Sequence, residues 1–270
     1  MKLCDEYKKY KWKPMTNKFE LDYRELLADI IKYGECAENR TDIKTQVLFN
    51  RNMNIDLRSG FPILTGKKIF FDKAYHEYVW FKEGMTTIRY LNDNGITWWN
   101  QYANKQGELG RTYGYQLRNY NGEFDQLEYV ISEIKLNSRR AHISLWNPEE
   151  MAVMNLPVCY TSFTFVRIND TLNMQMQFRS SDVFLGLPYD IIVGALLLTE
   201  IADFCELQAG ELGINISNAH VYKNHLSQSI EYLKSQFYDL PTYNFDRITG
   251  KTRTLLNYEH GPFIGAKLNN

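Results

Sequence analysis

The sequence of 270 residues has few cysteines, few prolines and almost no net charge. Its four cysteines show no CxxC spacing, which argues against a disulfide framework or a zinc ribbon and favours reduced thiols in a cytosol. Seven prolines and 16 glycines exclude a collagen-like or low-complexity chain. A net charge of −1 lacks the basic excess that is typical of nucleic-acid-binding proteins, so a few local cations must hold any bound anion.

Long hydrophobic runs are also missing. The longest apolar stretch, residues 191–198, is interrupted by Gly194 and is far shorter than the roughly 18 residues that a membrane span needs. Residues 1–14 are rich in lysine and tyrosine and have no apolar signal core. We therefore expect a cytoplasmic protein that neither crosses nor requires a membrane.

Aromatic side chains, in contrast, are abundant. The chain has 19 tyrosines, 15 phenylalanines and 5 tryptophans, enough to build a core without a disulfide or a metal. No repeat and no linker-like stretch is evident, so a single domain over residues 1–270 is predicted.

Hydrophobic periodicity predicts an α+β fold in which helices pack on one side of a substantial mixed or antiparallel sheet. Helices are expected at residues 19–33, 72–91 with a break near Gly84, 126–136, 188–207 and 220–233. Strands are expected at residues 45–49, 53–57, 141–145, 160–168 and 172–178. The last two strands are predicted to pair through a turn at Asn169-Asp170.

Cys159 is the strongest candidate nucleophile. It follows Pro157 at the beginning of a predicted strand, where a side chain can face a cleft. A reactive thiolate needs nearby positive charge, which Arg139-Arg140 or Arg179 would supply without titrating. The alternative is an inert, buried cysteine.

Two further groups of residues suit particular chemistry. Arg179-Ser180-Ser181-Asp182 follows a predicted strand and combines an arginine with hydroxyls, a set that fits a phosphate monoester, although a solvated turn is the alternative. Glu77 is followed by Tyr78, Trp80 and Phe81, and an apolar wall of this kind raises a carboxyl pKa and suits a proton donor or relay.

Metal binding is not expected. Trp80 occupies the place of the second histidine in an HExxH motif that would begin at His76. His220 and His225 have no cysteine or carboxylate partner at ligand spacing.

Several motifs, taken in order, resemble those of the thymidylate synthase family, which includes pyrimidine nucleotide hydroxymethylases. Together they extend over roughly residues 20–265. The matching stretches are Asn39-Arg40-Thr41, Phe61-Pro62-Ile63-Leu64-Thr65, His76-Glu77-Tyr78-Val79-Trp80-Phe81, Ser138-Arg139-Arg140, Leu156-Pro157-Val158-Cys159, residues 179–188 and residues 218–225.

The resemblance implies a thymidylate synthase-like fold that forms an obligate homodimer through its sheet, with methylenetetrahydrofolate as cosubstrate. It implies Cys159 as the nucleophile that adds to C6 of a pyrimidine nucleotide, with Glu77 and Tyr113 managing protons and ordered water. The residues implied to bind the nucleotide are Arg40, Arg179 and Ser180 at the phosphate, Arg139 and Arg140 from the partner subunit, and His220 and Tyr222 at the sugar. The residues implied to border the folate are Trp99, Asp182, Leu185, Gly186 and Tyr189.

Asp190 is the most informative departure from the resembling enzymes that use deoxyuridylate, which have asparagine there. An ionised carboxylate only accepts hydrogen bonds, and facing O4 of uracil it would leave an unpaired acceptor that costs on the order of 1–3 kcal/mol. Cytosine offers an amino donor instead, and a proton shared with N3 would stabilise the ring during thiol addition. Deoxycytidylate hydroxymethylases resemble this chain in having aspartate there. The alternative is a neutral substitution at the start of a helix, where negative charge is favourable.

Three more departures from the deoxyuridylate-using relatives also favour a hydroxymethylase. Tyr160 and Phe178 replace a histidine and a glutamine that organise water around the base and phosphate in the uracil-using relatives. The last residues, 266–270, are more polar than the apolar tail that seals folate in thymidylate synthases. Since a closed lid excludes water, a wetter tail favours water over hydride as the final reactant.

The sequence therefore predicts conversion of dCMP, or CMP, to its 5-hydroxymethyl derivative through a covalent adduct of Cys159 with C6. The choice between ribose and deoxyribose stays open. The alternatives are a dCMP methyltransferase that yields dihydrofolate, a thymidylate synthase acting on dUMP, and a catalytically silent nucleotide- or RNA-binding relative. Hydroxymethylases of this kind commonly serve phages that modify their DNA, and a phage enzyme would work in the host cytoplasm.

Overall fold

The computed structural model describes residues 17–245 and 253–269. Cys4 lies outside this part of the chain, and so does Asn270, the last residue of the polar segment 266–270. The described residues form the predicted α+β architecture, with a large sheet in the order β1-β2-β6-β5-β4-β3 and a small β7-β8 sheet. The strands are β1 (Glu35–Ala37), β2 (Thr45–Asp56), β3 (His142–Ser144), β4 (Tyr160–Ile168), β5 (Thr171–Asp182), β6 (Gln208–Tyr222), β7 (Thr242–Phe245) and β8 (Arg253–Leu256). The α-helices are α2 (Lys18–Tyr33), α3 (Phe71–Lys82), α4 (Arg89–Asp93), α5 (Tyr113–Arg118), α6 (Gln126–Lys135), α7 (Leu187–Phe204) and α8 (Leu226–Lys234).

The chain is divided into two compact units. The first takes Met1–Ile69, Ser180–Ile192 and Ile214–Asn270, and the second takes Phe70–Arg179 and Val193–Gly213. Each unit is assembled from segments that are not contiguous in the sequence. The single-domain organisation therefore stays a prediction.

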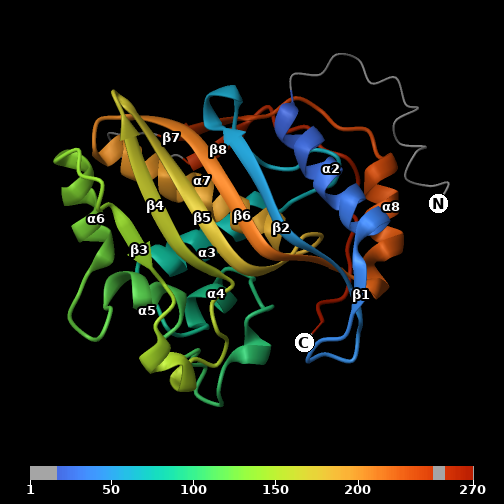
Figure 1. The fold of residues 1–270 in the computed structure, drawn as a ribbon, viewed down its shortest axis with the longest axis horizontal. Helices are drawn as coiled ribbons and strands as arrows, with labels where there is room; N and C mark the ends of the chain where they lie inside the picture. The colour runs from blue at the N-terminus through green and yellow to red at the C-terminus, as the bar shows by residue number, and fades with distance from the viewer. Residues whose placement is uncertain (1–16, 246–252, 270) are drawn as a thin grey trace. The chain divides into compact units, whose positions relative to one another are not determined.

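In the first unit, helix α2 packs beside helix α8, as Figure 1 shows. The ring of Tyr23 meets that of Tyr232 edge to face, with centroids 5.7 Å apart. The buried Glu20 carboxylate accepts hydrogen bonds from the Tyr232 hydroxyl and from the backbone N–H groups of Thr65 and Gly66. A buried charge is stable only when its oxygens are satisfied, so this carboxylate locks both helices onto the loop that leads to Lys67.

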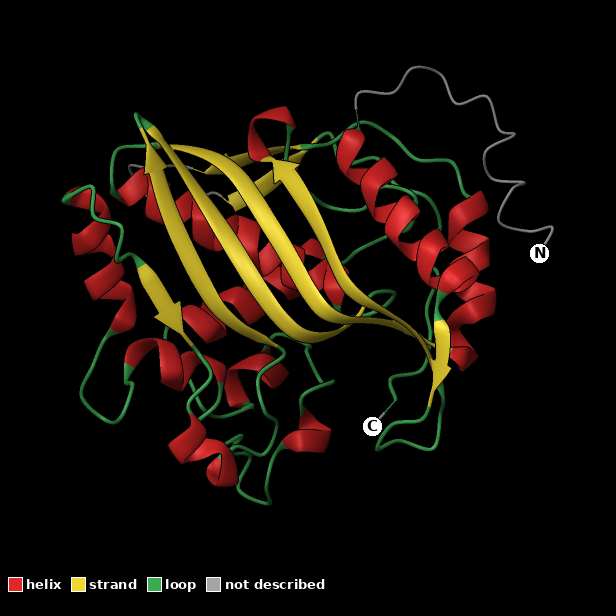
Figure 2. Ribbon diagram, in the orientation of Figure 1, coloured by secondary structure: helices red, strands yellow, loops and turns green. Residues whose placement is uncertain are grey.

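In the second unit, strands β4 and β5 form the predicted hairpin. Ile168 pairs with Thr171, and Asn169 adopts a φ of 54°, a left-handed conformation that asparagine tolerates in tight turns. Strand β3 lies beside β4, with helix α6 next to them (Figure 2). The predicted helix break is confirmed as well, because α3 ends at Lys82 and Gly84 follows with a φ of 71°.

Two predicted strand assignments are wrong. Residues 45–49 and 53–56 belong to one strand, β2, which continues through Asn50 at a φ of 54°, and Leu57 begins a short 3-10 helix. Strand β5 runs on to Asp182, so Arg179-Ser180-Ser181-Asp182 lies in a strand and not in the turn after one. Polar residues at a strand end resemble a loop in sequence, because β-propensity reflects packing against neighbours more than local preference.

The predicted helix at residues 220–233 is correct only in its second half. Helix α8 begins at Leu226, whereas His220 and Tyr222 end the long strand β6. Strand β6 was not predicted, although its buried Leu212, Ile214 and Ile216 alternate with more exposed residues. That alternation is the signal of a half-buried strand.

Candidate active site

The candidate nucleophile, Cys159, is half-buried and lies directly before strand β4. Its backbone N–H donates to the hydroxyl of Tyr113, 2.8 Å away, and its carbonyl accepts from the backbone N–H of Arg179 at 3.0 Å. The guanidinium of Arg179 donates to the carbonyls of Val158 and Pro157, at 2.8 and 2.9 Å. Hydrogen bonds thus join three predicted site residues, Cys159, Tyr113 and Arg179. The guanidinium of Arg179 also holds the backbone of the segment that carries the thiol.

Aromatic rings border this segment. The ring of Tyr160 packs 4.8 Å from Tyr113 and 5.8 Å from Phe178, measured between centroids, and both Tyr160 and Phe178 are buried. Phe81 and Phe163 contact the same tyrosine ring. The two departures noted in the sequence therefore lie in one apolar cluster beside the thiol segment.

Glu77 on helix α3 has the environment that its neighbours predict. Its Oε1 accepts a hydrogen bond from the indole Nε1–H of Trp99 at 3.0 Å, and the Trp99 ring packs against Trp80 with centroids 5.3 Å apart. Burial raises the pKa of Glu77 to about 7, although hydrogen bonds from Trp99 and Trp98 oppose the shift. Part of the residue still reaches solvent. A carboxyl group with a pKa near neutrality can both donate and accept a proton during a reaction.

The raised pKa makes Glu77 a source of pH-dependent stability. The folded protein holds this proton up to about pH 7, whereas an unfolded chain releases it near pH 4.5, so the free energy of unfolding falls as pH rises through that window. We expect Glu77→Gln, which has no proton to lose, to gain stability relative to the parent across the same window. Denaturant titrations of both proteins below and above this range measure the difference. A difference that stays constant with pH contradicts the assignment.

Ser180 and His220 of the first unit lie near the ends of the neighbouring strands β5 and β6. The Ser180 hydroxyl lies 3.4 Å from Nδ1 of His220, and the same nitrogen lies 3.0 Å from the amide oxygen of Asn218. The ring of Tyr222 meets His220 edge to face at 5.3 Å. A hydroxyl, an imidazole and a phenol here form a polar group of the kind that binds a sugar or a phosphate.

Asp182 ends strand β5 and organises the turn into helix α7. Its Oδ1 accepts the backbone N–H groups of Phe184 and Leu185 at 3.0 and 3.2 Å, and its Oδ2 lies 3.8 Å from Nδ1 of His225. These contacts hold the carboxylate in place before any ligand binds. Of the residues predicted to border folate, Asp182, Leu185, Gly186 and Tyr189 all belong to this turn and the helix start.

Asp190 lies in the first turn of helix α7 and is half-buried. Its backbone N–H donates to the carbonyl of Gly186 at 3.1 Å. A Cβ built at Gly186 would lie 3.8 Å from the carboxylate of Asp190, an ordinary van der Waals distance, so Gly186 borders that carboxylate. The positive end of a helix stabilises a negative charge at such a position.

Two groups that were not predicted from the sequence hold this turn. The Tyr23 hydroxyl donates to the carbonyl of Val183, and Nζ of Lys67 donates to the carbonyl of Phe184 at 2.7 Å. Lys67 is buried, and burial lowers its pKa to about 8. The only signal in the sequence is that Lys67 closely follows the Phe61–Thr65 motif.

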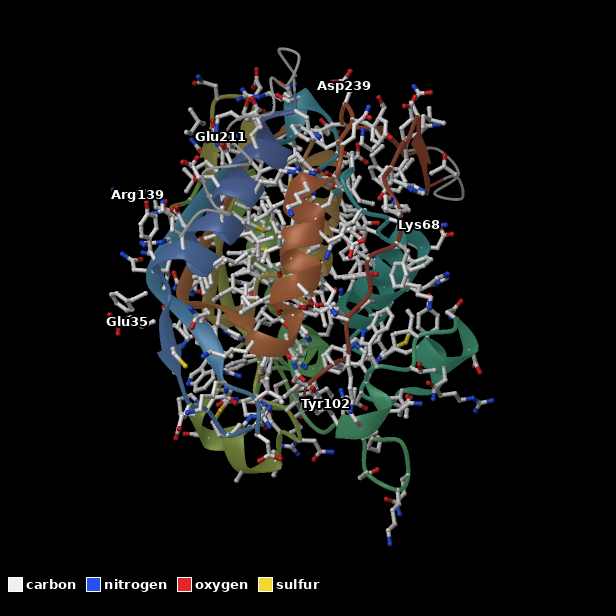
Figure 3. The ribbon with its side chains drawn as sticks, turned by 90° about the vertical axis from the view of Figure 1, so that its right-hand side faces the viewer. Glu35, Lys68, Tyr102, Arg139, Glu211 and Asp239 are labelled. Carbon is white, nitrogen blue, oxygen red and sulfur yellow. The ribbon has the colours of Figure 1, made fainter. Side chains whose placement is uncertain are left out.

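The remaining predicted phosphate ligands are exposed. Arg40 lies outside any helix or strand, and Arg139 and Arg140 lie just before strand β3. Figure 3 shows the side chain of Arg139 at the surface. Exposure suits residues that are expected to serve a partner subunit, but their role stays a prediction. Trp99, expected beside folate, directs its indole N–H to Glu77.

The described residues contain no group of three or more histidine, cysteine or carboxylate side chains that could hold a metal ion. Within the same part of the chain, no helix combines the length and apolar character required to cross a bilayer.

A comparison with protein families matches residues 21–269 to a family model described as thymidylate synthase. The match includes the thiol segment, Glu77, the turn that begins at Asp182, and Asp190. Members of this family use methylenetetrahydrofolate as cosubstrate, act on a pyrimidine nucleotide and are usually dimeric. The chain therefore belongs to the thymidylate synthase family and is a folate-dependent one-carbon transferase acting at C5 of a pyrimidine nucleotide.

Proposed function

We propose that this enzyme is a deoxycytidylate or cytidylate 5-hydroxymethyltransferase. The observation that carries the proposal is Asp190, a carboxylate where uracil-using relatives have an amide. A carboxylate accepts from the 4-amino group of cytosine and shares a proton with N3, whereas it opposes O4 of uracil with a second acceptor. A site built around such an interaction discriminates strongly, because the wrong base leaves a polar group unpaired.

In the proposed reaction, the Cys159 thiolate forms a bond to C6, which makes C5 nucleophilic. C5 forms a bond to the one-carbon unit of methylenetetrahydrofolate. The C5 hydrogen then leaves as a proton, and the bond between the transferred carbon and the folate nitrogen breaks, which releases tetrahydrofolate. Water then adds to the resulting exocyclic methylene group, and loss of the thiolate from C6 restores the aromatic ring. Sulfur suits this cycle because the thiolate is accessible near neutral pH and leaves readily.

The other predicted residues have supporting roles in the proposal. Glu77 moves protons and orients water, helped by its raised pKa, and Tyr113 holds the backbone of the nucleophile. Arg40, Arg179 and Ser180 bind the phosphate, and His220 and Tyr222 bind the sugar. In the proposed homodimer, Arg139 and Arg140 of each chain complete the phosphate site of the other.

The polar contacts of residues 267–269 support water as the last reactant. The amides of Asn224 and Asn269 exchange two hydrogen bonds, of 2.9 and 3.0 Å, and Nε2 of His225 lies 2.7 Å from the carbonyl of Lys267. The end of the tail is therefore held by polar groups in place of an apolar seal. Such a lid excludes water less completely, which favours a hydroxymethyl product over a methyl product.

Product analysis tests this proposal directly. The purified enzyme is incubated with methylenetetrahydrofolate and dCMP, CMP or dUMP in water enriched in heavy oxygen, and each nucleotide product is weighed by mass spectrometry. We expect a 5-hydroxymethylcytosine nucleotide that carries the heavy oxygen, with tetrahydrofolate released unoxidised.

Other outcomes would identify the alternatives. A methyl product together with an absorbance rise from dihydrofolate indicates a methyltransferase, and efficient turnover of dUMP indicates thymidylate synthesis. No product from any nucleotide indicates a silent binding protein. If cytidylate hydroxymethylation is confirmed, a pathway to hydroxymethylated cytosine in DNA, as in phages, is the proposed setting.

A further inference from the structure

A cluster of buried polar side chains in the second unit has no role in the proposed reaction. Its members are Glu150, Gln116 and Asn147, which are only 7%, 0% and 2% exposed. Glu150 lies in the short 3-10 helix at Pro148–Val153, Asn147 caps that helix, and Gln116 comes from helix α5. Burying a carboxylate is costly, so its contacts indicate what it stabilises.

The Glu150 carboxylate joins two segments. Its Oε1 lies 2.5 Å from Nη1 of Arg111, and its Oε2 accepts from the amides of Gln116 at 2.6 Å and Asn147 at 3.3 Å. The Gln116 amide also donates to the carbonyl of Arg111 at 2.6 Å. Charge-assisted hydrogen bonds of this length are among the stronger polar interactions in proteins. One carboxylate therefore holds helix α5 and its preceding loop against residues 147–153.

Further hydrogen bonds join the loop before helix α5, and the first residue of that helix, to residues 155–159, which lead to the nucleophile. The Asn155 N–H donates to the carbonyl of Leu109, and the Thr112 hydroxyl donates to the carbonyl of Leu156 at 3.0 Å. The last of them runs from the Cys159 N–H to the hydroxyl of Tyr113. Tyr113 begins the helix that Gln116 anchors, so displacing this helix would also displace the tyrosine that holds Cys159.

We propose that Glu150 is a positioning residue for the nucleophile, acting through helix α5 and Tyr113. The inference rests on the proposed role of Cys159 as nucleophile, but not on the identity of the base. The carboxylate keeps helix α5 and the segment from Asn147 to Cys159 in one arrangement. This arrangement holds the thiol of Cys159 in the geometry that the reaction requires. In Glu150→Gln one of the two acceptor oxygens of the carboxylate becomes an NH2 donor, so either Arg111 or the two buried amides lose their acceptor, and the segment before Cys159 becomes freer to move. A displacement of about 1 Å at a reacting atom can cost on the order of 100-fold in rate.

The test compares Glu150→Gln with Glu149→Gln, which makes the same change at the adjacent, exposed residue. Two rates are measured: tritium release from C5 of the nucleotide that the parent enzyme uses, and alkylation of Cys159 by iodoacetamide, followed by mass spectrometry of its peptide. We expect Glu150→Gln to lower kcat by about 10–100-fold with little change in the KM for the nucleotide, and to slow alkylation of Cys159. Glu149→Gln should match the parent in every measurement.

A folded Glu150→Gln protein with parental kcat and alkylation rate overturns the proposal, and so does a fall in kcat without any change in alkylation. If Glu150→Gln does not fold, Thr112→Val removes the next hydrogen bond, to Leu156, at nearly constant volume. Slower alkylation and a lower kcat in Thr112→Val then support the proposal, and parental values overturn it. Alkylation requires no substrate, so this arm stays decisive even if the parent enzyme turns over no nucleotide and the proposed function fails.

Discussion

Asp190→Asn is expected to exchange the base preference of the enzyme, raising kcat/KM for dUMP and lowering it for dCMP. The amide donates to O4 and accepts from N3–H of uracil, but it lacks the proton that Asp190 shares with N3 of cytosine. Each mispaired polar group costs on the order of 1–3 kcal/mol, and every 1.4 kcal/mol is about tenfold. The substitution removes a mismatch with uracil, and with cytosine it removes the proton that stabilises the ring during thiol addition, so both changes act on the ratio of the two kcat/KM values. This ratio should shift on the order of 10–100-fold.

The matched control is Asp203→Asn, the same chemical change near the other end of helix α7. It should leave the ratio of the two kcat/KM values at that of the parent. Steady-state rates with both nucleotides, at saturating methylenetetrahydrofolate, give this ratio for all three proteins. An unchanged ratio in Asp190→Asn would remove the argument for a cytosine substrate and leave the family assignment intact.

Cys159→Ser is expected to abolish turnover, with tritium release from C5 reduced by about 10⁴-fold or more. A hydroxyl is a much weaker nucleophile than a thiolate near neutral pH, and it cannot activate C5 without first adding to C6. Serine is close to cysteine in size, so the backbone hydrogen bonds to Tyr113 and Arg179 should persist. Nucleotide binding, measured by calorimetry, should therefore remain near that of the parent.

Cys36→Ser serves as the control, because Cys36 is an exposed thiol in strand β1. It should release tritium at the parental rate. Substantial release by Cys159→Ser would refute covalent catalysis by this residue. A parent protein that releases no tritium would indicate a silent relative.

The sequence predicted several elements well because their signals are local. Helices α2 and α6 each bury one apolar stripe, and the β4–β5 hairpin turns at an asparagine suited to its φ. Strand β6 was missed because its alternation changes phase between Ile216 and Ala219, and because its burial depends on neighbouring strands. The ends of strands were misread for the same reason.

The sequence also predicted the character of Glu77, since the aromatic residues that raise its pKa lie close to it along the chain. It did not predict that the donor to Glu77 is Trp99, 22 residues away. Nor did it reveal Lys67 and Tyr23 as supports of the turn after Asp182, because their partners are backbone carbonyls, which have no signature in a sequence.

By itself, the sequence determined which reactive groups this protein has: a thiol after Pro157, a carboxyl group among aromatic residues, and an acidic residue at the start of helix α7. The order of its motifs was sufficient to predict the family. The tertiary structure alone decided what holds these groups in place, including the hydrogen bond of Cys159 with Tyr113, 46 residues away, and the buried carboxylate of Glu150. The physical reason is that side-chain chemistry is a property of each residue, whereas burial and hydrogen bonding are decided by segments that only folding brings together.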